Sequence, residues 1–188
     1  LQRIRKYSSL SECLNKEALD AVCICVHTDL HYEMAKMALL NGINVFMEKP
    51  FCLHIQQAEE LIRLAKENDK ILMIAHVVRF MPPYLKLKRW IDSKEYGEVK
   101  FLSLSRFAGV PTWGQWKTKQ QDYGSTGGAL FDLAIHDIDY ASYILGQPDN
   151  IKCDYLPGPL SKHDYINAIW SYKERDISVK IEGGNTFH

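Results

Sequence analysis

Two short stretches of the 188-residue sequence carry side chains that could do acid–base chemistry. Glu48-Lys49-Pro50 follows an apolar run, and an ammonium group there can donate a hydrogen bond to an oxygen that gains negative charge during a reaction. In the second stretch, Asp132 and His136 are four residues apart and on a helix would share one face, with Asp139 three residues further on. A carboxylate can orient an imidazole that removes a hydroxyl proton near neutral pH. The sequence therefore predicts an acid–base site.

Each stretch also has a simpler interpretation. Glu48 and Lys49 can form an ordinary ion pair at a strand end, since such pairs are common and weak. His136 can be a partly buried histidine of a capped helix. Asp132 and His136 could also hold a metal ion, but no third ligand is well placed in the sequence. No metal site is therefore expected.

The elements around Lys49 are predicted by a change of apolar period along the first half of the chain. Short apolar runs rich in β-branched residues alternate with segments of helical spacing, which is typical of a doubly wound parallel sheet. In such sheets ligands bind outside the carboxyl ends of the strands, which is where Glu48 and Lys49 fall. The predicted strands are 21–26, 44–47 and 70–75, and the predicted helices are 30–40 and 55–68.

The second half of the chain begins where Pro82 and Pro83 end a strand and start a helix that runs to about Ser93. We therefore place a domain boundary between residues 1–81 and residues 82–188. The later pattern predicts a strand at 99–106, a long loop at 107–126, a helix at 128–145 and an antiparallel pair at 165–172 and 177–182. Three aromatic residues of the loop either stack on a sugar or seal the loop to the domain: Trp113, Trp116 and Tyr123.

Composition excludes several classes of protein. Hydrophobic residues make up 46% of the chain and charged residues 24%, which is typical of a globular domain rather than a disordered or fibrous one. Lys plus Arg and Asp plus Glu number 23 each, so no net charge attracts the chain to nucleic acid or to an anionic membrane. No apolar run is long enough to span a bilayer. Because the net charge is zero, the partner is expected to be a small molecule. Five scattered cysteines favour reduced thiols and a cytoplasmic location.

Four features in this order resemble the Gfo/Idh/MocA oxidoreductases, which include sugar and inositol dehydrogenases. The resemblance covers about residues 21–182. Its motifs are His31 at a helix start, Ala38 to Pro50 (Ala-Leu-Leu-Asn-Gly-Ile-Asn-Val-Phe-Met-Glu-Lys-Pro), Arg79-Phe80-x-Pro82-x-Tyr84, and Gly127-Gly128-x-x-x-Asp132-x-x-x-His136-Asp137.

This resemblance implies an α/β fold in which part of a Rossmann sheet precedes part of an α+β domain with a large open, mainly antiparallel sheet. The Gly-x-Gly-x-x-Gly turn is expected to precede Leu1, so the chain is expected to be an internal fragment. It also implies NAD or NADP as cofactor, a sugar, cyclitol or polyol as substrate, and a homodimer or homotetramer at full length. The implied catalytic residues are Lys49, Asp132 and His136; those that bind the cofactor are Val26, His27, His31, Glu48, Lys49 and Pro50; those that bind substrate are Lys49, Arg79, Asp132 and His136.

Departures from the family pattern keep other functions open. Val26-His27-Thr28 stands where relatives often have Thr-Pro-Asn, and Val77-Val78 replaces residues that are frequently polar. One alternative is a non-catalytic protein of this fold that binds a dinucleotide or a sugar. Another is an interaction module that associates through its second sheet. Both NAD and NADP are expected as candidate cofactors.

Overall fold

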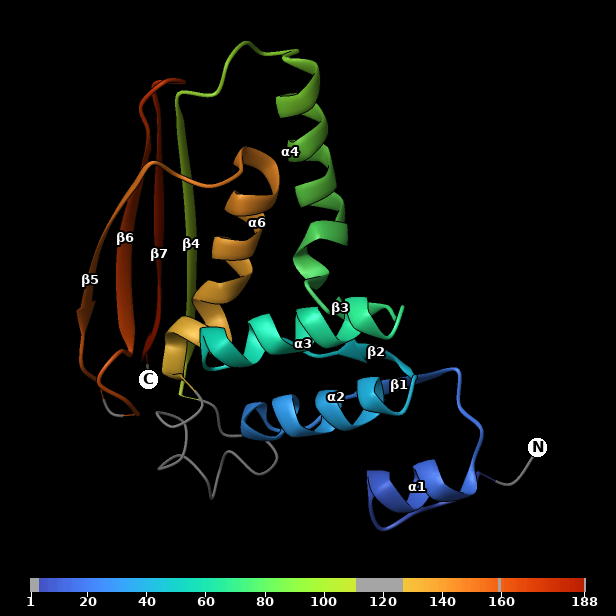
Figure 1. Ribbon diagram of the computed structural model, residues 1–188. Helices are drawn as coiled ribbons and strands as arrows, with labels where there is room; N and C mark the ends of the chain where they lie inside the picture. Colours follow the sequence, from blue (N-terminus) through green and yellow to red (C-terminus); the bar gives the residue numbers. More distant parts are fainter. Residues whose placement is uncertain (1–3, 111–126, 159, 188) are drawn as a thin grey trace. The chain divides into compact units, whose positions relative to one another are not determined.

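The computed structural model describes residues 4–110, 127–158 and 160–187, and it divides into two compact units, Leu1–Ala75 and His76–His188 (Figure 1). The 3-10 turn Val77–Phe80 belongs to the second unit because Val78 lies in that unit's core. The units thus divide at Ala75, whereas the sequence analysis placed the boundary after Met81. Trp113, Trp116 and Tyr123 lie outside the described residues, so their roles stay predictions.

The first unit is built around a three-stranded parallel sheet with the strand order β1-β2-β3. Helices α2 and α3 connect the strands and pack against each other and against the sheet, where Leu39, Met47 and Leu61 are fully buried. The predicted alternation of strands and helices is confirmed. The elements are α1 (Leu10–Lys16), β1 (Ala21–Ile24), α2 (His31–Leu40), β2 (Asn44–Met47), α3 (Ile55–Glu67) and β3 (Leu72–Ile74).

Helix α1 was not predicted, although the sequence holds a signal for it. The hydroxyl of Ser9, the N-cap residue, accepts a hydrogen bond from the amide of Glu12 over 3.1 Å. The Glu12 carboxylate in turn accepts from the amide of Ser8 over 2.9 Å. Ser-x-x-Glu is a recognised helix start, and here it precedes a helix of only seven residues.

The second unit is a four-stranded sheet with the strand order β4-β7-β6-β5. Strands β5, β6 and β7 pair antiparallel and β4 pairs parallel to β7, so the predicted mainly antiparallel sheet is confirmed. Helices α4 and α6 lie on one face of this sheet (Figure 1), where Trp170, Val179 and Ile181 pack against Tyr140. The elements are α4 (Pro82–Ser93), β4 (Phe101–Gly109), α6 (Ile135–Leu145), β5 (Asn150–Leu156), β6 (Tyr165–Tyr172) and β7 (Ile177–Phe187).

One local prediction in the second unit was wrong, and another needs a refinement. Strand β4 continues to Gly109, where a loop was expected from Phe107, because its pairing with β7 continues there past a register shift. The helix expected at 128–145 is confirmed in its extent, and within it Leu130–Ala134 winds as a π-helix before α6 begins at Ile135. Within the residues that the structure describes, no helix is long and apolar enough to cross a membrane.

Candidate functional site

The carboxyl ends of the strands in the first unit form a rim at one edge of the sheet. The amide of Glu48 donates to the carbonyl of Ile24 over 3.0 Å, and the amide of Ala75 donates to the carbonyl of Met47 over 2.8 Å. These bonds keep the strand ends level, so the segment after β1 and the segment after β2 run side by side. The predicted residues Val26, His27, Glu48, Lys49 and Pro50 all fall on these two segments.

His31 joins the two segments of this rim. Its side chain is buried, with the residue 1% exposed at the start of α2. Nδ1 lies 2.8 Å from the carbonyl oxygen of Pro50, and Nε2 lies 3.2 Å from the carbonyl oxygen of Val26. The imidazole therefore holds the backbone after β1 to the backbone after β2. Direct contact of His31 with a cofactor stays a prediction.

Glu48, Lys49 and Pro50 form a tight turn. The Lys49–Pro50 peptide is cis, and the Glu48 carboxylate accepts a hydrogen bond from the amide of Lys49 over 3.2 Å. Lys49 is half-buried, and its ammonium group is a hydrogen-bond donor. The arrangement can present a hydrogen-bond donor to an oxygen of a bound molecule.

The second group of predicted residues lies where the π-helix meets α6. Gly127 and Gly128 start this segment with φ of +97° and +60°, values that favour glycine. Asp132 lies in the π-helical part and His136 in the first turn of α6. Because a π-helix bonds each residue to the fifth one along, the α-helical spacing used for Asp132 in the sequence analysis does not hold there. Such π-helical turns occur frequently at functional sites.

Arg79 makes its contacts within the second unit. Its Nε donates to the Asp139 carboxylate over 2.8 Å, and Nη2 donates to the other oxygen of the same group. The guanidinium also lies over the ring of Tyr143, 4.7 Å from the centroid, and His76 Nε2 lies 3.6 Å from Asp139. Hydrogen bonding to Asp139 raises the pKa of Arg79 above its usual value. A substrate contact by Arg79 stays a prediction.

Arg106 and Asp137 form a second bidentate pair, which sequence reasoning missed. Arg106 Nε and Nη2 donate to the two Asp137 oxygens over 2.8 and 3.0 Å, and Nη2 also donates to the Tyr84 hydroxyl over 3.1 Å. Asp137 is 1% exposed, so its charge is compensated inside the fold. Hydrogen bonding to Asp137 raises the pKa of Arg106. The sequence signal was two acidic residues, Asp137 and Asp139, on a largely apolar helix.

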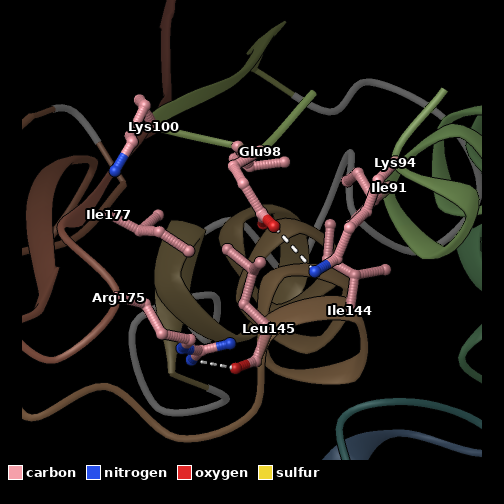
Figure 2. A pocket seen from close by; sticks show the side chains of 9 residues that line it. Ile91, Lys94, Glu98, Lys100, Ile144, Leu145, Arg175 and Ile177 are labelled. Atoms are coloured by element: carbon pink, nitrogen blue, oxygen red, sulfur yellow. Dashed lines mark hydrogen bonds and ion pairs between the residues drawn. The ribbon is translucent and has the colours of Figure 1, made fainter. Parts of the chain in front are cut away.

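The second unit also contains a cavity of about 390 Å³, shown in Figure 2, that lies away from these residues. It lies between the ends of α4 and α6 and the start of β7. Lys94 pairs with Glu98 over 2.7 Å, and Arg175 donates to the carbonyl of Leu145. His136 is nine residues from Leu145 along α6, which corresponds to about 13 Å of helix. The cavity is therefore separate from the candidate site.

Family models match most of the chain. A model described as an oxidoreductase family with an NAD-binding Rossmann fold matches residues 2–76, and the model of the GFO/IDH/MocA C-terminal domain matches residues 84–183. Among the residues that the structure describes, no group of three or more His, Cys, Asp or Glu could hold a metal ion.

Similar proteins include three bacterial oxidoreductases. The uncharacterized oxidoreductase YhhX of Escherichia coli is 34% identical over 92% of this chain and 49% of its own length. The scyllo-inositol 2-dehydrogenase (NAD(+)) of Bacillus subtilis is 32% identical over 72% of this chain and 38% of its own. The D-glucoside 3-dehydrogenase of E. coli is 34% identical over 69% of this chain and 36% of its own length. The chain thus spans about half the length, or less, of these curated relatives.

Solved structures share the fold. The structure of yhhX has a TM-score of 0.75 at 29% identity and covers 95% of this chain and 50% of its own. The WlbA dehydrogenase of Bordetella pertussis, in complex with NADH and UDP-GlcNAcA, has a TM-score of 0.86 at 19% identity. The match covers 98% of this chain and 54% of the WlbA chain. At that identity the second match shows the fold alone.

Proposed function

This chain belongs to the Gfo/Idh/MocA oxidoreductase family, and from that premise we propose that the whole protein transfers a hydride between NAD or NADP and a hydroxyl-bearing carbon of a sugar, cyclitol or related polyol. The observation that carries the proposal is the Glu48-Lys49-Pro50 turn, fastened by His31 to the segment after β1. Relatives named for scyllo-inositol and D-glucoside oxidation support the substrate class. The proposal includes a cytoplasmic location and a homo-oligomer.

The rim in the first unit fits the nicotinamide end of a dinucleotide. It offers backbone groups of Val26 and His27 together with the half-buried residue Lys49, whose ammonium group can donate hydrogen bonds. A bound dinucleotide supplies the acceptor or donor of the hydride. The 188 residues contain no Gly-x-Gly-x-x-Gly sequence, so the proposal assigns these residues to the nicotinamide end and not to the pyrophosphate.

The residues take complementary roles in the proposed oxidation. His136 accepts the hydroxyl proton of the substrate, and Asp132 orients the substrate. The role proposed for Lys49 is to donate a hydrogen bond to an oxygen that gains negative charge in the reaction. The hydroxyl carbon loses a hydride and the oxygen loses a proton, so the products are a carbonyl compound and a reduced dinucleotide.

The test uses the full-length protein with NAD or NADP and a panel of sugars, inositols and other polyols. We expect an increase in absorbance at the wavelength of reduced nicotinamide with at least one polyol, and a large loss of that rate in Lys49→Ala. No turnover with any member of the panel, together with cofactor binding measured by calorimetry, would instead favour a binding protein. The altered Val26-His27-Thr28 segment is the observation that keeps this second candidate.

A further inference from the structure

Helix α6 is held on two sides by bidentate arginine–carboxylate pairs that come from different elements. Arg106, on β4, holds Asp137, and Arg79, in the turn Val77–Phe80, holds Asp139. Residues of an α-helix are about 100° apart around the axis, so Asp137 and Asp139 project about 160° apart, on nearly opposite sides of α6. His136 lies in the sector between them, about 100° from Asp137 and about 60° from Asp139.

We infer that Arg106 with Asp137, and Arg79 with Asp139, are positioning residues that fix the rotation of α6 and thereby the placement of the His136 imidazole. This inference rests on the proposed function, in which His136 accepts the substrate proton. All four side chains then share one role, the positioning of α6. The sequence analysis proposed this role for none of them.

The geometry of the pairs supports an orienting role. Each guanidinium uses Nε and Nη2 on both oxygens of one carboxylate, a planar arrangement that constrains angle as well as distance. Both carboxylate side chains are shielded from solvent, with 2% and 9% exposure for Asp137 and Asp139. A buried ion pair contributes little more to stability than an apolar contact of the same size, so stability alone does not account for two of them beside one histidine.

The surroundings of Arg106 extend this constraint to α4. Its Nη2 also donates to the hydroxyl of Tyr84, and the backbone carbonyl of Tyr84 accepts from the Tyr140 hydroxyl over 2.6 Å. The rings of Tyr84 and Tyr140 meet edge to face with centroids 4.7 Å apart. Helix α6 is thus connected to both β4 and α4 close to His136. At its far end it is held separately, by a hydrogen bond from Tyr172 to Gly146.

The test compares Arg106→Lys with Tyr172→Phe in the full-length enzyme. Lysine keeps the positive charge but cannot donate to both carboxylate oxygens in one plane. Tyr172→Phe removes one hydrogen bond over 2.9 Å at the opposite end of α6. We expect Arg106→Lys to lower kcat about tenfold to a hundredfold with KM within about threefold, since small misplacements of a catalytic group have effects of this size. Tyr172→Phe should leave both kcat and KM unchanged, even if its melting temperature falls as much as that of Arg106→Lys.

A second readout does not depend on turnover. In protein labelled with ¹³C at histidine Cε1, the His136 signal is assigned by its loss in His136→Asn. We expect this signal to move in Arg106→Lys and to stay in place in Tyr172→Phe. An unchanged His136 signal and an unchanged kcat in folded Arg106→Lys would overturn the inference. A wild-type protein that turns over no polyol, but whose His136 signal moves in Arg106→Lys, would support the positioning role while the proposed function fails.

Discussion

The Nδ1 atom of the buried His31 side chain lies 2.8 Å from the carbonyl oxygen of Pro50. Its Nε2 atom faces the carbonyl of Val26 on the neighbouring segment. One buried ring thus connects the two backbone segments that form the proposed nicotinamide rim. Lys49 directly precedes Pro50, so its backbone is part of a segment that this ring contacts.

Replacing His31 should weaken both the fold and cofactor binding. His31→Ala leaves the buried carbonyl of Pro50 and the part-buried carbonyl of Val26 without the ring nitrogens that face them. An unpaired buried carbonyl costs about 2 kcal/mol of unfolding free energy. We expect the Kd for NADH, measured by fluorescence titration of the full-length protein, to rise several-fold. We also expect a lower midpoint of unfolding in urea. His54→Ala, which alters an exposed histidine just before α3, is the control and should change neither. Equal NADH affinity in His31→Ala and wild type would contradict this role.

The turn before the π-helix depends on glycine at position 127. A Cβ there would lie 2.6 Å from the Cβ of Phe131, and φ is +97°. Gly97 is a matched control, since its φ is +92° but a Cβ would meet no heavy atom within 4 Å. Gly127→Ala should therefore lower the stability of the second unit by about 1–3 kcal/mol more than Gly97→Ala, through the clash alone. Chemical denaturation of both variants measures this difference. Equal losses of unfolding free energy would show that the segment around Phe131 shifts to make room for the added Cβ.

Arg79 should contribute to stability through Asp139. Arg79→Ala leaves a carboxylate that is 9% exposed without its bidentate partner, which costs about 3 kcal/mol. Lys100→Ala breaks the exposed pair with Asp176, and we expect a loss of less than about 1 kcal/mol. Urea unfolding of the two variants separates these cases. A loss in Arg79→Ala as small as that in Lys100→Ala would mean that water replaces the arginine.

The protein should lose stability in alkali through a buried thiol in the first unit. Burial raises the pKa of Cys52 from 9.0 to about 11. The folded state therefore keeps a proton that the unfolded state releases, so this contribution is complete below pH 9 and is lost as the pH rises through about 11. Cys52→Ala should flatten the fall in unfolding free energy between these values. Parallel profiles for Cys52→Ala and wild type would count against this assignment.

Local sequence patterns predicted the elements that bury a continuous apolar run or a helical stripe. Strand β2 has the predicted bounds, Asn44–Met47, and α4 begins at the predicted Pro82. Strand β5 was missed although Ile151, Cys153 and Tyr155 alternate with polar residues, because an edge strand that is exposed throughout lacks a strong apolar signal.

The candidate site was predicted only in part, for a physical reason. The motif around Lys49 is contiguous in sequence, so its position after a strand followed from the strand itself. The partners that fix the site are distant: Arg106 and Asp137 are 31 residues apart, and Arg79 and Asp139 are 60 apart. No spacing rule links such pairs, since they meet only when β4 and the turn Val77–Phe80 pack against α6. The π-helical winding at Asp132 likewise depends on the folded unit rather than on local spacing.

The central claim, hydride transfer from a polyol carbon with His136 as the proton acceptor, is tested most directly by following an isotope. The full-length enzyme is given oxidised cofactor and a polyol deuterated at the reacting carbon, in ordinary water. We predict that mass spectrometry finds one deuterium in the reduced nicotinamide, and that His136→Asn forms it about 10² to 10⁴ times more slowly. Reduced cofactor without deuterium, or an unchanged rate in His136→Asn, would contradict the account.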